Sequence, residues 1–309
     1  MAYIISSTLI LISLISLITQ GLNQGVDFVG GRSYTVRFEN AVNPTEISSI
    51  LNSEFGSAEV KTFGEDNQLK ITTKYKVNTE GVAVDKEIHQ KLYSSLQPYL
   101  PDAITYQDFV KGSSEKTIGI MSSIKVGPTI ADDIKNNSFL AVIGSLIVVF
   151  LYILIRFQKW QFSLGAVAAV FHDVLVVLGI FSITYTFMPF SMEINQAFIA
   201  AILTVIGYSL NDTVVVFDRI REYINEHTKW EFENTVNAAL NSTLSRTLNT
   251  SLTTLIVLLA IFIFGGESIR GFMFALIIGV IVGTYSSVFI ATPVMYDTQK
   301  KKVLLEEKK

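Results

Sequence analysis

Six long apolar runs divide the chain, at residues 2–19, 138–155, 162–185, 196–217, 245–264 and 272–293. Each run is about 20 residues long, the length at which an α-helix crosses a ~30 Å hydrocarbon layer. Charged positions gather instead in residues 20–137, near residues 218–233 and in the C-terminal tail. The pattern predicts a polytopic α-helical membrane protein with six transmembrane helices and one sizeable domain between the first two.

The positions of the spans predict how the chain is divided, with one outward-facing domain inserted between the first two transmembrane helices. We expect transmembrane helix 1 at 1–19, an extracytoplasmic domain at 20–137, helices 2–6 within 138–293 with a cytoplasmic loop at 218–244, and a cytoplasmic tail at 294–309. Only 17% of the residues are charged, against about 25% in a typical soluble domain. The net charge of −3 gives no support for a nucleic-acid partner, and the absence of cysteine excludes disulfides and thiolate metal sites. We therefore expect a lipid environment, and no nucleic acid, metal or cofactor.

The first apolar run has two interpretations, a cleaved signal peptide or a retained helix. No basic residue precedes it, and residues 19–23 lack the small-x-small pattern of a cleavage site. The pattern therefore favours a retained first span. Because the basic flank is missing, Met1 is either the native start or a point within a longer polypeptide.

The asymmetry of basic residues sets the expected orientation. One set of connections and the tail are basic: Arg156, Lys159, Arg219, Arg221, Lys229, Arg246, Lys300, Lys301, Lys302, Lys308 and Lys309. The opposite short connections carry a single cation, Arg270, beside Glu193 and Glu267. Both termini are therefore predicted to face the cytoplasm. We assign no role to the two glutamates at this stage.

The outward domain has the local signals of a mixed α+β fold. Strands are expected at 34–38, 58–63 and 68–74, with a turn at 64–67 between the last two.

Two helices are expected in the same domain. One follows Asn43, where an Asn-Pro cap opens a run to residue 55, and the other lies at 82–96, where apolar residues follow a helical stripe. A last strand comes from 104–110 or from 116–126. The β-α-β-β-α-β order is that of a ferredoxin-like unit. Without a catalytic cluster it predicts a binding or lever domain and no enzyme.

Ionisable residues inside membrane spans are costly and mark functional sites by default. Asp212, preceded by Asn211, lies inside the fourth span, and Arg246 lies at the start of the antiparallel fifth span. The two are predicted at similar depth and able to form an ion pair suited to proton binding and release. Tyr208 and Thr250, each one turn away, extend the expected hydrogen-bonded path. A static pair that locks two helices is the alternative from these residues alone.

Other polar and small residues have simpler interpretations. His172 and Asp173 lie halfway along the third span, and as sequence neighbours on different helix faces they need not share a proton. They are secondary candidates for the proton path. The charged stretch 218–222 is interpreted as a solvated helix end. Gly279 and Gly283, four residues apart, predict close helix packing.

The segment after the fourth span has an apolar pattern with two interpretations. Its apolar residues fit either an amphipathic helix at the membrane surface or core packing beneath the helix bundle: Trp230, Phe232, Val236, Ala239 and Leu240.

Several motifs resemble those of the SecF proteins, in the SecD/SecF family of protein-export membrane proteins. Residues 25–31 (GVDFVGG), 172–174 (HDV) and 208–222 (YSLNDTVVVFDRIRE) are similar to family signatures, the last nearly letter for letter. Residues 246–254 (RTLNTSLTT), 264–266 (FGG) and 283–287 (GTYSS) follow in family order. The match covers essentially the whole chain. Only the missing basic N-terminal flank departs from the pattern, which leaves open the SecF half of a fused SecDF polypeptide.

The resemblance implies a six-span half of a transporter of the resistance–nodulation–division superfamily. Its expected partners are SecD, the Sec channel (SecYEG) and unfolded preproteins, in the bacterial cytoplasmic membrane. It also implies coupling to the proton motive force through the residues that match Asp212 and Arg246, with Asn211 in the same motif. The expected function is an accessory subunit of preprotein translocation.

Three alternatives stay open at this point. The chain would be a structural subunit that stabilises the SecD–channel complex without conducting ions, or a small-molecule exporter of the same superfamily. The coupling ion is H⁺ or Na⁺. Protons are favoured because an arginine opposes a bound cation, whereas a hard cation needs several oxygen ligands.

Overall fold

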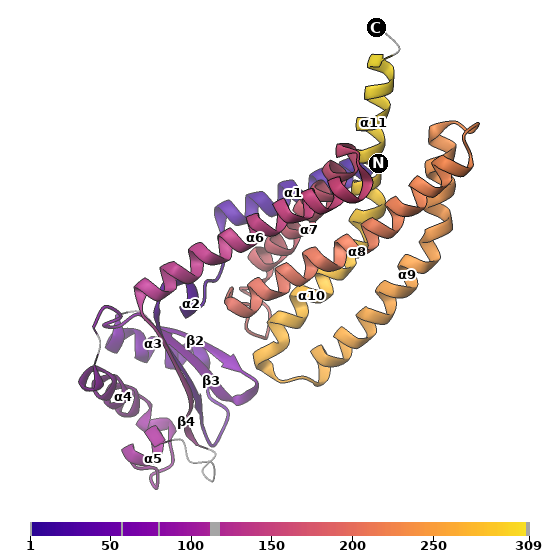
Figure 1. Cartoon of the computed structure of the whole chain (residues 1–309). Coiled ribbons are helices and arrows are strands. Elements are labelled where there is room, and N and C mark those ends of the chain that lie inside the picture. The colour runs from indigo at the N-terminus through magenta and orange to yellow at the C-terminus, as the bar shows by residue number, and fades with distance from the viewer. Residues whose placement is uncertain (1, 57, 80, 112–117, 307–309) are drawn as a thin grey trace.

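The computed structural model describes residues 2–56, 58–79, 81–111 and 118–306. A small α+β domain lies at one end of a bundle of long helices, and both termini lie at the opposite end (Figure 1). Among the described residues, six helices are long and apolar enough to cross a membrane, which confirms the predicted fold class. The membrane helices, in chain order, are α1 (Ala2–Thr19), α6 (Pro128–Phe157), α7 (Trp160–Thr184), α8 (Gln196–Glu226), α9 (Phe232–Phe264) and α10 (Glu267–Ser286), which continues through η2 (Ser287–Ala291) into α11 (Thr292–Glu306).

The outer domain contains a four-stranded antiparallel sheet in the order β2-β3-β1-β4. Its elements are α2 (Val26–Val29), β1 (Gly31–Arg37), α3 (Pro44–Phe55), β2 (Ala58–Phe63), β3 (Glu65–Thr73), α4 (Val82–Leu96), η1 (Gln97–Tyr99), α5 (Tyr106–Lys111) and β4 (Gly119–Val126). This order and strand direction are those of the predicted ferredoxin-like unit. Asn43 caps α3 by accepting a hydrogen bond from the backbone N–H of Thr45, as its sequence signal predicted.

One local prediction in this domain is wrong, and one pair of alternatives is decided. The four-residue turn at 64–67 does not form, because β3 already begins at Glu65 and Gly64 alone turns the chain at φ 89°. Glycine adopts this left-handed conformation without a steric penalty. The alternative strand at 104–110 is instead the helix α5, and β4 is the last strand. Residues 116 and 117, which the other alternative included, lie outside the described residues.

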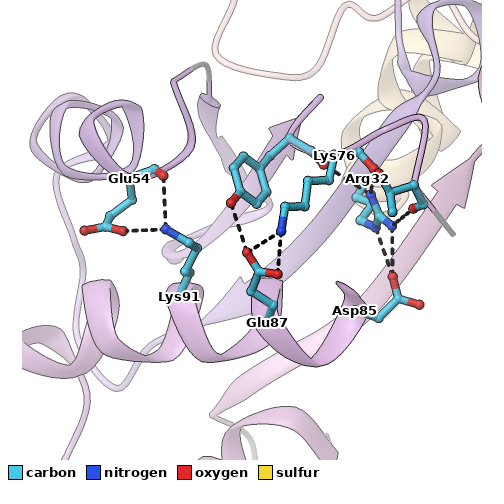
Figure 2. Close-up of polar contacts among 8 residues, drawn as sticks. Arg32, Glu54, Lys76, Asp85, Glu87 and Lys91 are labelled. Atoms are coloured by element: carbon cyan, nitrogen blue, oxygen red, sulfur yellow. Dashed lines mark hydrogen bonds and ion pairs between the residues drawn. The ribbon is translucent and has the colours of Figure 1, made fainter. Parts of the chain in front are cut away.

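A buried arginine fixes α4 to the sheet (Figure 2). Arg32 of β1 is 1% exposed and lies 3.0 Å from the carboxylate of Asp85. Its guanidinium also donates to three carbonyl oxygens of the segment after β3, those of Tyr75, Lys76 and Thr79. Two exposed ion pairs hold the same face of α4, Lys76 with Glu87 and Lys91 with Glu54. The hydrogen bond from Lys76 lowers the pKa of Glu87. The buried guanidinium is fully paired, so the domain has a rigid connection between sheet and helix.

The membrane helices extend past the predicted spans. α6 begins at Pro128, within the predicted outer domain, and α8 and α9 leave only residues 227–231 between them. The predicted loop at 218–244 is therefore mostly helix. Val236 and Ala239 are buried beneath the bundle beside Phe217 and Ile220, as the core-packing interpretation of this segment predicted, whereas Trp230 is 50% exposed. The last span continues as α11 through the start of the predicted tail.

Candidate functional site

Asp212 lies buried in the middle of α8, with 3% of its surface exposed. Its carboxylate accepts a hydrogen bond from the Ser251 hydroxyl of α9 at 3.4 Å. The Tyr208 hydroxyl donates to Ser251 at 3.3 Å, and the Thr284 hydroxyl of α10 lies 2.6 Å from Ser251. Three helices thus bring a carboxylate and three hydroxyl groups into one cluster, which we call the Asp212 cluster. Such a cluster can bind a proton and pass it along hydrogen bonds.

The predicted ion pair between Asp212 and Arg246 does not form in this structure. No ion pair joins them among the described residues, and Arg246 is exposed. Ser251 stands opposite the carboxylate instead, five residues farther along α9, which is about 7.5 Å of helix rise. The prediction was wrong because antiparallel direction gives helix depth only approximately, whereas the relative shift of the two helices depends on their packing.

Arg246 lines a water-accessible cavity at the end of α8 that also carries Asp218 and Glu222. Its volume is about 400 Å³, enough for several water molecules. Asp218 pairs with Arg156 at 2.9 Å and with Arg221 at 3.1 Å, all at partly exposed positions. This agrees with the interpretation of the charged stretch as a solvated helix end. The cavity places a fixed positive charge on the side of the Asp212 cluster that faces the bundle's N- and C-terminal end.

Two predicted path residues lie outside the Asp212 cluster. Asn211 is exposed on the outer surface of α8. The Thr250 hydroxyl donates to the backbone oxygen of Arg246 within α9. Among the residues that the structure describes, no hydrogen bond joins either side chain to Asp212. Sequence reasoning selected Thr250 and missed its neighbour Ser251, although both belong to the motif at 246–254. A hydroxyl residue one position away points about 100° around the helix, so the motif alone did not separate them.

A second carboxylate lies buried between α7, α8 and α10. Asp173 is 1% exposed and accepts hydrogen bonds from Ser209 at 2.6 Å and Ser286 at 2.7 Å. Its other oxygen lies 3.1 Å from Nδ1 of His172. The two neighbours, which the sequence analysis expected on different helix faces, therefore lie within hydrogen-bond distance of each other. The imidazole ring is long enough to lie beside the adjacent carboxylate, even though the two Cβ atoms leave the helix in different directions.

Close packing of α10 against α8 brings these polar residues together. A Cβ atom at Gly279 would collide with Val205, and one at Gly283 would lie 3.1 Å from the Ser209 side chain. This confirms the predicted close approach at the glycine pair. The hydroxyl residues that sequence reasoning missed, Ser209, Thr284 and Ser286, lie next to this contact. The sequence signal that could have identified these three residues was their position within the motifs at 208–222 and 283–287.

The glycine-rich motif at 25–31 joins the outer domain to α8. The backbone of residues 23–25 pairs with Ile194, with Gly25 N–H donating to the Ile194 oxygen at 2.9 Å and Ile194 N–H donating to Asn23 at 2.7 Å. The Asp27 carboxylate accepts from the backbone N–H of Gln196 at 3.1 Å, at the start of α8. A carboxylate at a helix N-terminus is favourable because it satisfies free N–H groups and the helix dipole. The motif thus holds the outer end of the helix that carries Asp212.

Glu193 contributes an ion pair at the same junction. Its carboxylate lies 2.6 Å from Nζ of Lys70 on β3, with the two side chains 8% and 17% exposed. Leaving Glu193 without a role in the sequence interpretation was therefore wrong. Nothing in the sequence near either residue indicated the pairing, because 123 positions separate them. The pair connects the sheet of the outer domain directly to the connection between α7 and α8.

Comparison with known proteins gives a consistent result. The family model for protein export membrane protein SecD/SecF, C-terminal, matches residues 105–301, and the SecD/SecF GG motif model matches residues 15–42. A protein translocase subunit SecF from Rhodothermus marinus is 45% identical over 97% of this chain and 91% of its own length. One from Vibrio alginolyticus is 36% identical over 94% of this chain and 85% of its own.

Solved structures give the same match in three dimensions. The crystal structure of SecDF, a translocon-associated membrane protein from Thermus thermophilus, has a TM-score of 0.77 and 29% identity over 97% of this chain. A second SecDF structure has a TM-score of 0.65 and 28% identity over 99% of the chain. The chain spans 38% and 39% of the length of these two SecDF chains.

Proposed function

The chain belongs to the SecD/SecF family of protein-export membrane proteins, and we propose that it acts with a SecD-type half as a translocase subunit driven by the proton motive force. It would promote movement of unfolded preproteins that emerge from a SecYEG-type channel. Its curated relatives carry the name of translocase subunits, and its structural relatives are SecDF chains of which this chain spans 38% and 39%. We place it in the bacterial cytoplasmic membrane with both termini in the cytoplasm, on the basis of the basic connections. Family membership favours this function over small-molecule export.

The observation that carries the proton-driven part is the Asp212 cluster. A carboxylate buried in the membrane bundle, three hydroxyl groups around it and a nearby cavity lined by charged side chains, Arg246 among them, are the parts that reversible proton binding needs. We assign proton binding to Asp212, transfer along the hydroxyl groups to Ser251 and Tyr208, and a charge-balancing role to Arg246. Asn211 and Thr250 have no contact that supports a direct part in transfer.

The driving force is sufficient for repeated movement. One elementary charge that crosses a potential of 100 mV releases about 2.3 kcal/mol. Protonation of Asp212 would change its hydrogen bond to α9 and so the packing of α8. Because Asp27 and the Lys70–Glu193 pair attach the outer end of α8 and its preceding connection to the outer domain, movement at Asp212 would reach that domain.

The test compares inverted vesicles that contain this chain and its SecD-type partner at equal expression. Asp212→Asn should abolish the proton-dependent part of translocation while the complex stays assembled. Asp132→Asn is the matched control, because it makes the same chemical change at an exposed position on α6. Full proton-dependent translocation by Asp212→Asn would contradict the assignment.

A second candidate function is a structural subunit that holds the SecD-type half. The observation that favours it is an exposed apolar stripe along α9, a helix whose extensive contacts in the described part of the chain are those with α8 and α10. The stripe is formed by Leu248, Leu252, Ile256, Leu259 and Ile263. In that case Asp212→Asn would assemble and function normally, whereas polar substitutions along the stripe would release the partner.

A further inference from the structure

The site around Asp173 is closed, polar and separate from the Asp212 cluster. Asp173 lies on α7, its two hydroxyl donors lie on α8 and α10, and all three side chains are buried. Both serine hydroxyl groups donate to the same carboxylate oxygen, Oδ2, so Oδ1 is left to His172. Among the described residues, Asp173 Oδ1 thus has a single polar contact, with His172 Nδ1 at 3.1 Å.

His172 has an unsatisfied polar atom in the same site. The side chain is 2% exposed, and among the described residues its Nε2 has no hydrogen-bond partner. A buried ring nitrogen without a partner is costly in a finished structural network. A ring nitrogen without a partner is expected where the proton of the imidazole ring moves between its two nitrogen atoms. The free nitrogen therefore distinguishes this site from a static, fully satisfied one.

The charge balance of the pair also requires a proton. If His172 is neutral and donates from Nδ1, the pair carries one negative charge inside the helix bundle. In the part of the chain that the structure describes, no lysine or arginine forms an ion pair with Asp173. An ion buried without a counterion costs several kcal/mol. One added proton makes the pair neutral.

Among the described residues, the hydrogen bonds of His172 and Asp173 join them to each other and to Ser209 and Ser286, and to no further titratable group. The ring centre of Tyr285 on α10 lies 6.1 Å from that of His172, and Asp212 lies on α8 three residues beyond Ser209. The remaining titratable groups with described side chains on the elements packed against α7 are Tyr3 on α1; Asp132, Asp133, Lys135, Tyr152 and Arg156 on α6; Tyr208, Asp218, Arg219, Arg221, Glu222, Tyr223 and Glu226 on α8; Arg270 on α10; and Tyr296 and Asp297 on α11.

The helix that supplies Ser286 is irregular at this position. The π-helical segment η2 begins at the next residue, Ser287, and the Thr292 hydroxyl donates to the Ser287 oxygen at 3.1 Å. Single π-helical turns inside α-helices are frequent at functional sites. The irregular turn makes a change in helix register at Ser286 less costly, because it already departs from the regular hydrogen-bond pattern.

We propose that His172 and Asp173 form a second proton-binding site, which takes up one additional proton per pair. Without that proton, His172 carries a single N–H on Nδ1 that donates to the ionised carboxylate. Uptake of one proton from water gives a neutral Asp173 whose O–H donates to Nδ1, while the ring carries its N–H on Nε2. The site gains one proton, and the ring changes tautomer.

The two sites share two helices. α8 carries Asp212 and also Ser209, which donates to Asp173. α10 carries Ser286, which donates to Asp173, and Thr284, whose hydroxyl contacts Ser251, the donor to Asp212. A shift of α10 against α8 therefore changes the hydrogen bonds of both sites together. The part that Asp173 plays in translocation rests on the proposed proton-driven function, whereas its proton binding does not.

The first test is nitrogen NMR on the full chain in lipid nanodiscs, with ¹⁵N-labelled histidine. The chain has three histidines, so His89→Gln and His227→Gln assign the His172 signals. We expect the His172 signals to change from the Nδ1–H to the Nε2–H tautomer across a pH titration, and this change to be lost in Asp173→Asn. Constant His172 signals over the whole range in the folded wild-type chain would overturn the proposal.

The second test is infrared difference spectroscopy of carboxyl groups over the same titration. In an Asp212→Asn background we expect one protonated-carboxyl band that disappears when Asp173→Asn is added. Ser286→Ala keeps the carboxyl group and removes one donor, so it should shift the titration midpoint of that band even if Asp173→Asn does not fold. An unchanged midpoint in Ser286→Ala, together with no band assignable to Asp173, would overturn the proposal.

The two proposals fail in different experiments. Loss of proton-driven translocation in Asp212→Asn with no titration at His172 supports the proposed function and overturns the second site. Titration at His172 with normal translocation in Asp212→Asn supports the second proton-binding site and overturns the assignment of Asp212.

Discussion

The Lys70–Glu193 ion pair connects two parts of the molecule that the sequence keeps far apart. Lys70 lies on β3 of the outer domain, and Glu193 lies in the connection that leads into α8. The pair borders a cavity of about 270 Å³ between the polar face of the sheet and the outer ends of α8 and α10. Removal of one partner leaves the other charged, mostly buried and without a counterion.

The magnitude follows from the burial of the two side chains. Removing one member of a buried ion pair typically costs about 3–5 kcal/mol. Because Lys70 keeps 17% exposure, we expect the lower end for Lys70→Met, about 3 kcal/mol. Since about 1.4 kcal/mol is a tenfold change, the ratio of docked to undocked outer domain should fall roughly 100-fold. The double variant Lys70→Met/Glu193→Gln removes both charges and should be less destabilised than Lys70→Met alone.

The chain has no cysteine, so introduced cysteines give specific labels. Spin labels at Glu65→Cys on β3 and at Thr186→Cys, two residues past the end of α7, report the distance between domain and bundle by pulsed EPR in nanodiscs. We expect one narrow distance distribution in the otherwise unaltered chain and a broad one in Lys70→Met. Lys76→Met is the matched control, because its ion pair lies within the outer domain and is exposed. Equal broadening in the single and double variants would refute the reasoning, since the two charges would then not be coupled.

Three further predictions test the bundle and the outer domain. Ser251→Ala should reduce proton-driven translocation in the vesicle assay, whereas Thr250→Val should leave it nearly unchanged, because only the first hydroxyl belongs to the Asp212 cluster; equal effects would contradict this assignment. Gly279→Val should lower the thermal stability of the detergent-solubilised chain by about 1–3 kcal/mol through overpacking, while Gly207→Ala, which has open space, should not. Burial lowers the pKa of His89, so the unfolded chain binds more protons between that lowered pKa and about 6.5. Stability should therefore fall as pH drops below about 6.5, and His89→Gln should weaken that dependence in chemical unfolding of the full chain.

The sequence alone determined the features that depend on neighbouring residues. Six apolar runs predicted six membrane helices, because any segment that crosses hydrocarbon must be apolar and must satisfy its own backbone hydrogen bonds. The cap at Asn43 and the stripe of α4 predicted two helices of the outer domain with their observed bounds. The glycine pair at 279 and 283 predicted a close helix contact, since small side chains permit it wherever the partner lies.

The tertiary structure alone decided which side chains meet. The placement of Ser251 opposite Asp212, the contact of His172 with Asp173 and the pairing of Glu193 with Lys70 each depend on how elements shift and rotate against one another. A rotation of a helix by one residue moves a side chain by about 100°, and a shift of one turn moves it by about 5.4 Å. The hydropathy of the sequence carries no information on helix rotations and shifts of this size, because they leave the pattern of apolar residues unchanged. They result from the packing of all the helices together, and they decide which hydroxyl group reaches a buried carboxylate.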